Sequence, residues 1–434
     1  MKLLITFLIL FTSAIVPITA VVQEDLSLGE ALQTGLQNNY GIRISVQNIE
    51  ISRNNNTWGT AGRYPTINIG VDQTNAFSYQ PDVDIPGTTI TNKLSPYVNL
   101  NWILFNGFRI QITKDKLGLL NQFSEGNSAI IVESTVQAII LAYYNVLLEK
   151  EKLSVLEEVQ KLSKDRYDYE LKRRELGISV SYDVLQAKIA YLSDTSNVLL
   201  QQANYHNALR NLNLVLGEPV EKTFNPADTF SAEMLEYKIE DLILKMEESN
   251  KTLKNQYINL ALLKKDAEIQ KSYLYPSLSI NSGINMAAQR LKPAGGTAYN
   301  RSSYDYYVNF SLDFNLFNGG NTKRAISNAK IQHRIGELEI EELKLILKNQ
   351  LYTTFELYNV RKQIYEVAEE SLKSAALNMS ISNEKFKTGA INSFNYRDVQ
   401  LVYQSIAIER LEAIYNVIDT HTELMRLTGG IVRE

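Results

Sequence analysis

Four segments of the chain alternate between apolar and polar residues. In residues 305–316 every second side chain is apolar, and residues 277–286, 67–72 and 98–104 show the same period. A period of two is typical of a β-strand whose two faces meet different surroundings. We therefore predict four strands, each of roughly 10–12 residues.

Two interpretations of these strands differ in what covers the apolar face. In a soluble sandwich, the apolar face packs on a second sheet. In a membrane barrel with a water-filled interior, the apolar face is turned toward lipid. The polar faces here are rich in Asn, Ser, Asp and Gly and lack the Lys and Glu that usually coat a soluble sheet. Aromatic residues cluster at the strand ends, as in interfacial girdles: Tyr64, Tyr79, Tyr97, Phe105, Tyr275, Tyr304 and Phe317. Both features favour the membrane barrel.

Four strands are too few to make a membrane barrel alone. A bilayer forbids an open sheet edge, and the smallest bacterial barrels have about eight strands. Eight strands pack shut with side chains, whereas about twelve or more begin to leave a lumen. The pattern therefore predicts an oligomer and favours three or more copies.

Long segments without proline predict the helices, because proline breaks helix interiors. We expect first helices at 26–62 and 237–274, long helices at 109–176 and 321–388, and return helices at 181–216 and 393–428. The long helices would each reach ~100 Å at 1.5 Å per residue. Their apolar residues follow a coiled-coil period near 3.5; in the second they are Leu351, Phe355, Tyr358, Tyr365, Ala368, Leu372, Ala375 and Met379. An ordinary bundle core has similar spacing, but this length favours a coiled coil.

The chain repeats itself. The sequence LFNGF at 104–108 returns as LFNGG at 316–320, and Gly177 matches Gly389 at the same offset of 212 residues. We predict a signal peptide at 1–20, a first repeat at 21–216, a connection at 217–236 and a second repeat at 237–434. The fold class we expect is mixed and mainly α, from an internally duplicated chain.

The repeated Asn-Gly pairs lie where a strand is followed by a long helix. Asn-Gly usually marks a hairpin, but no second strand follows either copy. We therefore expect Asn106-Gly107 and Asn318-Gly319 to form strand-to-helix junctions, with glycine supplying the positive φ that the reversal needs.

The N-terminus reads as a secretory signal, with Lys2 before an apolar stretch at 3–16 and a cleavage box at 18–20. A membrane anchor is the alternative. After residue 20 we expect no apolar run near the ~20 residues of a membrane-spanning helix. The mature chain is therefore predicted to be exported without helical spans.

The composition excludes several classes of function. The chain has no cysteine and a net charge of −4, so thiol chemistry is excluded and nucleic acid is not expected as a partner. No phosphate loop or hydrolase motif is present. The three histidines, His206, His333 and His421, are far apart in sequence. We expect no enzyme, no metal and no cofactor.

Tyr64-Pro65 matches Tyr275-Pro276 upstream of the strands. The paired Tyr-Pro, LFNG and helix-tip motifs together resemble those of the TolC-type outer-membrane efflux proteins. The resemblance covers essentially residues 21–434. It implies a homotrimer in the outer-membrane lipid of a Gram-negative bacterium. Three chains would supply a 12-stranded barrel and a 12-helix periplasmic coiled-coil tube. The function it implies is the passive exit duct of a tripartite efflux pump or type I secretion system, docked to an inner-membrane transporter through a periplasmic adaptor.

The resemblance also assigns roles to the two helix tips. Pore-entrance positions match Asn395 and Asp398, of which only Asp398 keeps the family's acid. Adaptor contact is implied for the tip residues Gly177, Ile178, Asp183, Gly389, Ala390 and Phe394. A tyrosine and an arginine that can latch the family's closed state are replaced by Phe386 and Ile391, which weakens the expectation of that latch.

Two other functions fit parts of the sequence. A periplasmic coiled-coil adaptor also carries long helical hairpins, but it would not normally double the whole unit or carry aromatic-girdled strands. A surface binding protein would use the loops expected at 80–94 and 287–303, and these do not explain helices of such length.

Overall fold

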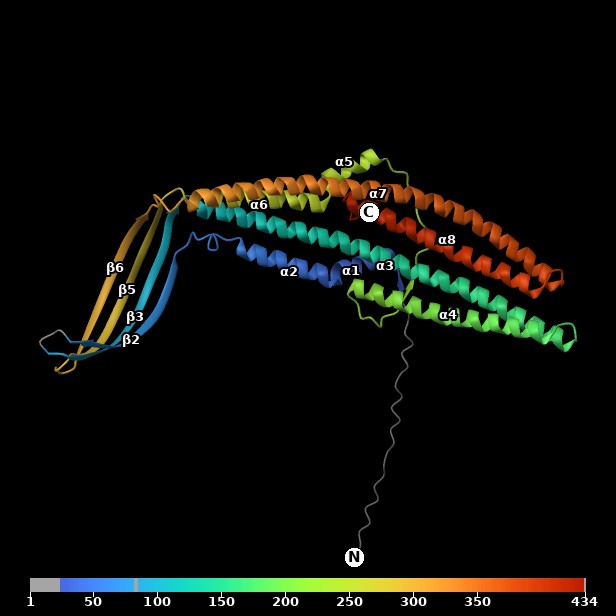
Figure 1. The fold of residues 1–434 in the computed structure, drawn as a ribbon, viewed down its shortest axis with the longest axis horizontal. Helices are drawn as coiled ribbons and strands as arrows, with labels where there is room; N and C mark the ends of the chain where they lie inside the picture. Colours follow the sequence, from blue (N-terminus) through green and yellow to red (C-terminus); the bar gives the residue numbers. More distant parts are fainter. Residues whose placement is uncertain (1–23, 82–84, 433–434) are drawn as a thin grey trace, which may run out of the picture.

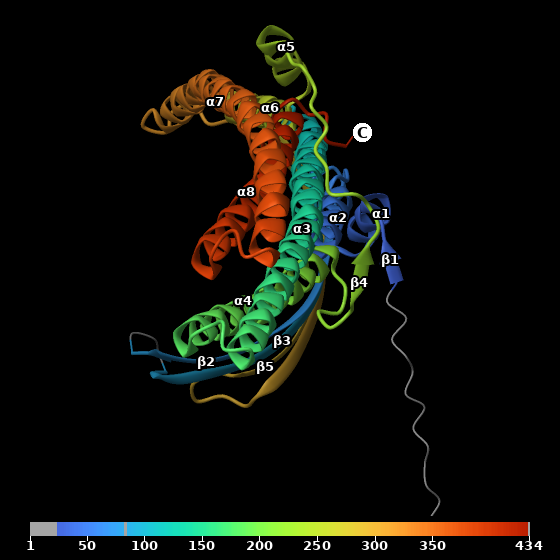
Figure 2. The ribbon, with the colours of Figure 1, turned by 90° about the vertical axis from the view of Figure 1, so that its right-hand side faces the viewer.

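The structure is a computed structural model that describes residues 24–81 and 85–432. The predicted signal peptide lies outside these residues. The molecule is elongated, with a curved sheet at one end and helices that run away from it to two paired tips at the other (Figure 1). Viewed along the long axis, the helices form a curved wall and not a closed bundle (Figure 2).

The sheet contains four antiparallel strands in the order β2-β3-β5-β6. Their bounds are β2 Thr66–Gln80, β3 Gly87–Asn106, β5 Ser277–Lys292 and β6 Tyr299–Asp313. Strands β2 and β6 form the two edges, so each has one side unpaired within the described chain.

The strands are 15 to 20 residues long, and the prediction of 10–12 is wrong. Most of the loops expected at 80–94 and 287–303 is strand, because pairing continues through polar positions such as Asn92 opposite Arg290. The backbone ladder does not require an apolar face. Pro96 lies inside β3, opposite Val71. At the end that leads to α7, β6 is shorter than the alternating pattern predicted, because it ends at Asp313 and not at residue 316.

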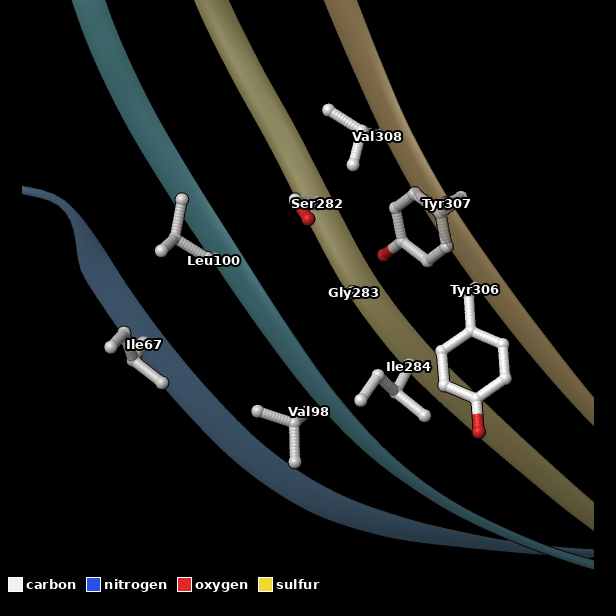
Figure 3. A pocket seen from close by; sticks show the side chains of 9 residues that line it. All are labelled: Ile67, Val98, Leu100, Ser282, Gly283, Ile284, Tyr306, Tyr307 and Val308. Carbon is white, nitrogen blue, oxygen red and sulfur yellow. The ribbon is translucent and has the colours of Figure 1, made fainter.

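One face of the sheet is apolar across all four strands. Ile67 pairs with Leu100, and Val98 pairs with Ile284, which in turn pairs with Tyr306. Figure 3 shows these side chains beside one another. The opposite face carries a row of asparagines, in which Asn281 lies between Asn101 and Asn309. The predicted alternation is therefore a property of the whole sheet.

Two long helical hairpins make up most of the molecule. The first pairs α3 (Arg109–Glu175) with α4 (Ser181–Leu216), and the second pairs α7 (Asn321–Lys387) with α8 (Ser393–Leu427). Helices α3 and α7 have 67 residues each, which confirms the predicted helices to within one residue at each end.

The first helix of each repeat is broken, and the prediction of single helices at 26–62 and 237–274 is wrong. The first repeat has α1 (Leu28–Asn38) and α2 (Tyr40–Asn55), and the second has α5 (Ile239–Ser249) and α6 (Lys251–Ser272). Asn39 and Asn250 separate them with extended ψ angles of 126° and 122°. Each asparagine accepts a backbone hydrogen bond at the start of the next helix, and so acts as its N-cap.

A short parallel ladder lies beside the first repeat. Strand β1 (Glu24–Leu26) pairs with β4 (Phe224–Pro226), which lies within the predicted connection. The hydroxyl of Tyr143 on α3 lies 2.8 Å from the carbonyl oxygen of Leu26 and 2.6 Å from Asp228 Oδ2. These contacts fix the connection to the middle of α3.

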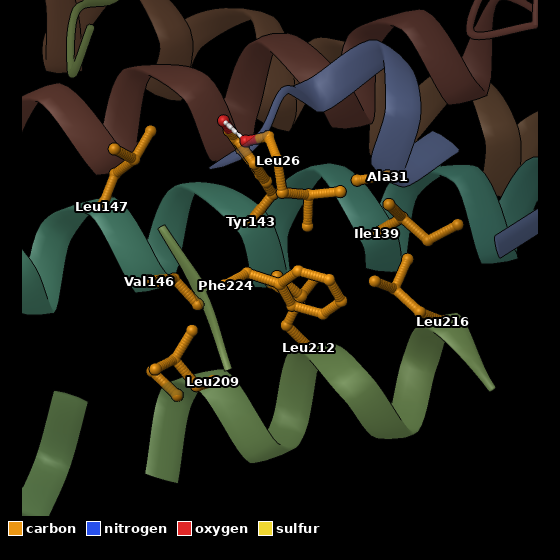
Figure 4. Packing of buried hydrophobic residues seen from close by; sticks show 12 residues of the cluster. Leu26, Ala31, Ile139, Tyr143, Val146, Leu147, Leu209, Leu212, Leu216 and Phe224 are labelled. Carbon is orange, nitrogen blue, oxygen red and sulfur yellow. Dashed lines mark hydrogen bonds between the residues drawn. The ribbon is translucent and has the colours of Figure 1, made fainter. Parts of the chain in front are cut away.

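Each repeat has its own apolar core, halfway along the helices. In the first, Ile139 and Val146 of α3 pack against Leu212 of α4 and Phe224 (Figure 4). The second core uses the matching positions, including Leu351, Tyr358 and Leu424. The two cores are copies of one packing arrangement.

Helix α3 includes an 18-residue stretch with mean hydropathy 1.5, long and apolar enough to span a membrane by composition. The prediction that no such run follows residue 20 is therefore wrong. The buried apolar residues of α3 lie mostly between Val136 and Leu148, where α3 packs against α1, α4 and β4. Within the described structure 39% of the 18-residue stretch is buried.

Candidate functional site

The two tips are tight turns of the same design. Gly177 and Gly389 have φ of 75° and 76°, in the left-handed region. The next N–H groups, of Ile178 and Ala390, donate back to the carbonyls of Arg173 and Lys385, at 2.8 Å each. This is the Schellman arrangement that closes helix C-termini. A Cβ at either glycine would meet nothing within 4 Å, so φ and not space requires glycine here.

The tips present apolar side chains to solvent. Ile178 is 63% exposed and Phe394 is 81% exposed. Asp183 lies in the first turn of α4, and the Asn392 side chain caps α8 by accepting from the Asn395 N–H at 2.8 Å. Exposed apolar residues on rigid turns are a feature of docking surfaces.

The structure brings two of the predicted tip residues together. Asp183 from the first hairpin and Phe394 from the second line one groove of about 340 Å³. Its other lining residues are Arg166, Tyr182, Gln186, Ile189, Ala190, Ser193, Ser393 and Arg397. The predicted entrance residues Asn395 and Asp398 lie outside this groove. Both are exposed, and Asp398 forms no salt bridge within the described part of the chain.

A buried ion pair joins the two hairpins beneath the groove. Arg397 of α8 donates two hydrogen bonds of 2.7 Å to the carboxylate of Asp194 on α4. Ser163 of α3 donates to the same carboxylate at 2.6 Å. Asp194 is 3% exposed, so its carboxylate is shielded from water and depends on these partners.

Arg166 adds a second cation to this cluster. Its Nη1 donates to the Ser393 carbonyl at 3.1 Å, which ties α3 to the start of α8. Burial, and then the nearby positive charge of Arg397, lower the pKa of the Arg166 guanidinium to about 10. It remains charged at neutral pH.

Sequence reasoning did not find Asp194, Arg397 or Arg166. Asp194 and Arg397 are 203 residues apart, and nothing in the sequence marks them as partners. Phe386 and Ile391 occupy the positions where the resemblance would place the latch tyrosine and arginine. Phe386 stacks on Tyr396 at 4.5 Å and lies edge-on to Tyr169, so it belongs to an aromatic cluster.

The strand-to-helix junctions share a second local design. Gly107 and Phe108 have φ of 69° and 64°, and Gly319 and Gly320 have φ of 67° and 78°. The Asn106 side chain accepts from the Ile110 N–H at 3.3 Å. Asn318 accepts from the Thr322 N–H at 3.4 Å. Two left-handed residues and an asparagine therefore turn each strand into its helix.

The histidines are not grouped with each other. Within residues 24–81 and 85–432 no three His, Cys, Asp or Glu side chains form a metal-binding group. His421 stacks on Tyr237 and lies 2.7 Å from its hydroxyl.

A two-faced sheet joined to paired 67-residue helices, with exposed tips at the far end, defines a channel subunit of the bacterial envelope. The family model described as "Outer membrane efflux protein" matches residues 31–218 and 242–430, and the chain belongs to this family. It is an outer-membrane channel of efflux systems that extends into the periplasm, and the family is not one of enzymes. The two matched segments reflect the internal duplication.

Solved structures show the same fold. CusC, whose crystal structures follow folding and transmembrane channel formation, is 17% identical with a TM-score of 0.75 over 94% of this chain and 93% of its own. The outer membrane channel CmeC of Campylobacter jejuni is 15% identical, with a TM-score of 0.72 over 93% and 85%. The open-state MtrE channel of Neisseria gonorrhoeae is 14% identical, with a TM-score of 0.71 over 93% and 89%. No curated protein matches the sequence significantly.

The TolC-type resemblance is thus confirmed, and the interpretation as a periplasmic adaptor is excluded by the family assignment.

Proposed function

We propose that three copies of this chain form one passive exit duct, with a 12-stranded barrel in the outer membrane and a 12-helix tube through the periplasm. The observation that carries this proposal is the open four-stranded sheet with one exposed apolar face. A bilayer does not tolerate the unpaired edges of β2 and β6, so these edges must pair between copies.

The helices support the same assembly. Helix α4 exposes an apolar stripe formed by Leu185, Ile189, Leu192 and Leu199. Helix α7 exposes Leu338, Leu345 and Tyr352 at seven-residue spacing, and then Val360 and Val367. Within the described chain neither stripe is covered. Coiled-coil packing of one copy's stripe against the next copy would bury both.

The chain-level organisation follows from this assembly. The repeats at 21–216 and 237–434 each supply two strands and one hairpin, and the connection at 217–236 lies outside the helical wall as part of a belt. At the tips, Gly177, Ile178, Asp183, Gly389, Ala390 and Phe394 dock a periplasmic adaptor of an inner-membrane transporter. Asp398 and Asn395 line the entrance. The pump or type I secretion system supplies the energy, and the duct is passive.

An electron-microscope image of the detergent-purified protein tests the assembly. We expect a threefold tube roughly 130–140 Å long, from ~100 Å of helix and a barrel of ~25–35 Å. A particle that stays monomeric, or that is soluble without detergent, would overturn the proposal.

Photo-crosslinkers at Ile178 and Ala390 test the docking role in cells. We expect both to trap a periplasmic adaptor, because both residues lie at the outermost turns. The matched control is a crosslinker at Lys330, an exposed residue of α7 near the sheet end. Crosslinked adaptor formed from Lys330, but from neither Ile178 nor Ala390, would refute docking at the tips.

A further inference from the structure

Both tryptophans of the chain lie together at the end of the sheet where α3 begins. Trp58 is in the segment between α2 and β2, and Trp102 is on β3. The Trp102 indole donates to the carbonyl oxygen of Arg63 at 3.0 Å, which holds the 56–65 segment against the strand. A groove of about 310 Å³ lies between them, lined by Trp58, Arg63, Trp102, Ile103, Leu104, Phe105, Asn106, Phe108, Ile110 and Gln111.

Two cations accompany Trp58. The Arg63 guanidinium carbon lies 4.7 Å from the centre of the Trp58 ring, and Lys114 Nζ lies 5.9 Å from it. Lys114 also donates to Asn56 Oδ1 at 2.7 Å. Within the described residues, neither cation has a carboxylate partner. Lys116, half a turn along α3, is different, since it pairs with Asp266. The groove is therefore flanked by positive charge that the chain does not neutralise.

The groove belongs to the apolar face of the sheet. Trp102 pairs with Ile280, which pairs with Phe310, so all three lie on the face that the proposed function turns toward lipid. Because α3 begins three residues after Asn106 ends β3, this end of the sheet is the periplasmic boundary of the bilayer. An apolar wall below two cations and an indole matches the amphipathic shape of a phospholipid at that depth.

The second repeat lacks this arrangement. At the positions that match Trp58, Arg63, Lys114 and Trp102 it has Ile269, Leu274, Ile326 and Phe314. Ile269 lies within α6, whereas Trp58 follows the end of α2, so the repeats differ here in backbone as well as in side chains. The cluster is therefore particular to the first repeat.

We propose that Arg63 and Lys114, beside Trp58, bind the phosphate of an anionic phospholipid in the periplasmic leaflet of the outer membrane. Trp102 and the apolar end of β3 contact the first part of its acyl chains. This proposal rests on the proposed function, because it takes the apolar face of the sheet to lie in a bilayer.

Tryptophan fluorescence tests the proposal directly, because the chain has only two tryptophans and both are in the site. The full-length protein is reconstituted in vesicles of equal parts phosphatidylcholine and phosphatidylglycerol. Bromines, which quench tryptophan, are placed near the glycerol end of the acyl chains of one lipid or the other. We expect brominated phosphatidylglycerol to quench more strongly, since each cation should favour the anionic lipid roughly fivefold.

Two variants and a control locate the effect. Arg63→Gln with Lys114→Gln should make the two brominated lipids quench equally. Arg43→Gln is the matched control: Arg43 is an exposed arginine of α2, 5.6 Å from the Tyr40 ring, and lies well away from the sheet. It should leave the preference for phosphatidylglycerol unchanged.

The outcomes separate this proposal from the proposed function. Equal quenching by both lipids in the unaltered protein places the sheet in a bilayer but overturns the phospholipid site. Absence of quenching by either lipid overturns the membrane placement as well. A change in tryptophan emission when inorganic phosphate is added in detergent, as large as that caused by phosphatidylglycerol, would assign the site to free phosphate and overturn the lipid.

Discussion

Three of the acidic residues near the tips, Asp194, Asp183 and Asp398, differ in their surroundings, and this difference separates their roles. Asp194 is buried against Arg397, and Asp183 lies on the groove between the hairpins. Asp398 is exposed and forms no salt bridge within residues 24–81 and 85–432. In the proposed threefold tube, three copies of Asp398 would contribute a ring of negative charge at the entrance, which concentrates cations.

We therefore expect Asp398→Asn to reduce the cation selectivity of the channel in a planar bilayer. The measurement is the reversal potential under a salt gradient, compared with that of the unaltered protein. Asp168→Asn is the control, because Asp168 is exposed on α3 and pairs weakly with Lys164 at 3.9 Å. A reversal potential that moves equally in both variants would show that Asp398 has no special place at the entrance.

Gly107 and Gly319, at the two strand-to-helix junctions, allow the same substitution to be compared at two matched positions. Gly107 and Gly319 have nearly the same φ, 69° and 67°. A Cβ on Gly107 would lie 2.3 Å from the Ser272 carbonyl oxygen, whereas a Cβ on Gly319 would meet nothing within 4 Å. Gly319→Ala should cost about 1–2 kcal/mol from the left-handed backbone alone.

Gly107→Ala should cost that amount and a further 1–3 kcal/mol for the backbone clash, since the strand and α6 must move apart. The check is the midpoint of thermal unfolding of both variants in the same detergent. Equal losses would mean that the close approach of Gly107 to α6 contributes nothing to stability.

At the scale of helices and strands, the sequence predicted what local residues determine. The long helices begin and end at Gly-containing turns, whose conformation is set within a few residues, so their bounds were correct to within one residue. The breaks at Asn39 and Asn250 were missed because they depend on distant partners. The Asn39 amide donates to the Val215 carbonyl, and the Asn250 amide donates to the Leu427 carbonyl.

Dependence on distant partners also explains why the strand lengths and the buried ion pair were not predicted. Strand lengths depend on pairing between polar residues from separate repeats, which a hydrophobic pattern does not record. The Asp194–Arg397 pair depends on how α4 and α8 pack, and neither residue stands out in its own helix. Asp183 and Phe394 were predicted as tip residues from the position of the tips, while the groove that they line and the cluster beneath it required the fold.

Tyr143 makes the contact between α3 and the connection sensitive to alkaline pH. Burial, and then its hydrogen bond with Asp228, raise the pKa of the Tyr143 hydroxyl above its ordinary value. Burial similarly raises the pKa of Tyr144, Tyr205, Tyr358 and Tyr415. The unfolded chain loses these protons first, so the stability is complete below about pH 10 and is lost as the pH rises further.

We expect the midpoint of thermal unfolding to fall steeply above about pH 10. Tyr143→Phe should cost about 1–2 kcal/mol at pH 7, through the lost hydrogen bonds, and should make the alkaline fall shallower. The exposed Tyr182 gives the control, since Tyr182→Phe should change neither quantity. An unchanged alkaline slope in Tyr143→Phe would show that this hydroxyl titrates alike in the folded and the unfolded protein.

For the whole molecule, the duplicated chain supplies four strands in sequence but leaves the sheet open at β2 and β6. In the proposed trimer the sheet closes between copies, with β6 of one chain beside β2 of the next. The absence of cysteine makes this testable, because every disulfide will come from introduced residues.

We expect one or more cysteines scanned along β2 to crosslink with Asn309→Cys of β6 and to give dimers and trimers on a denaturing gel. Larger products should be absent, because a ring of three has no free edge. The control is Val98→Cys with Ile284→Cys, which are paired within one chain and should yield only a crosslinked monomer. If the scan along β2 gave only monomer while the control pair crosslinked, the edges would not meet, and the barrel would have to close in some other way. A ladder beyond three would show that the ring contains more copies than the twelve-stranded barrel allows.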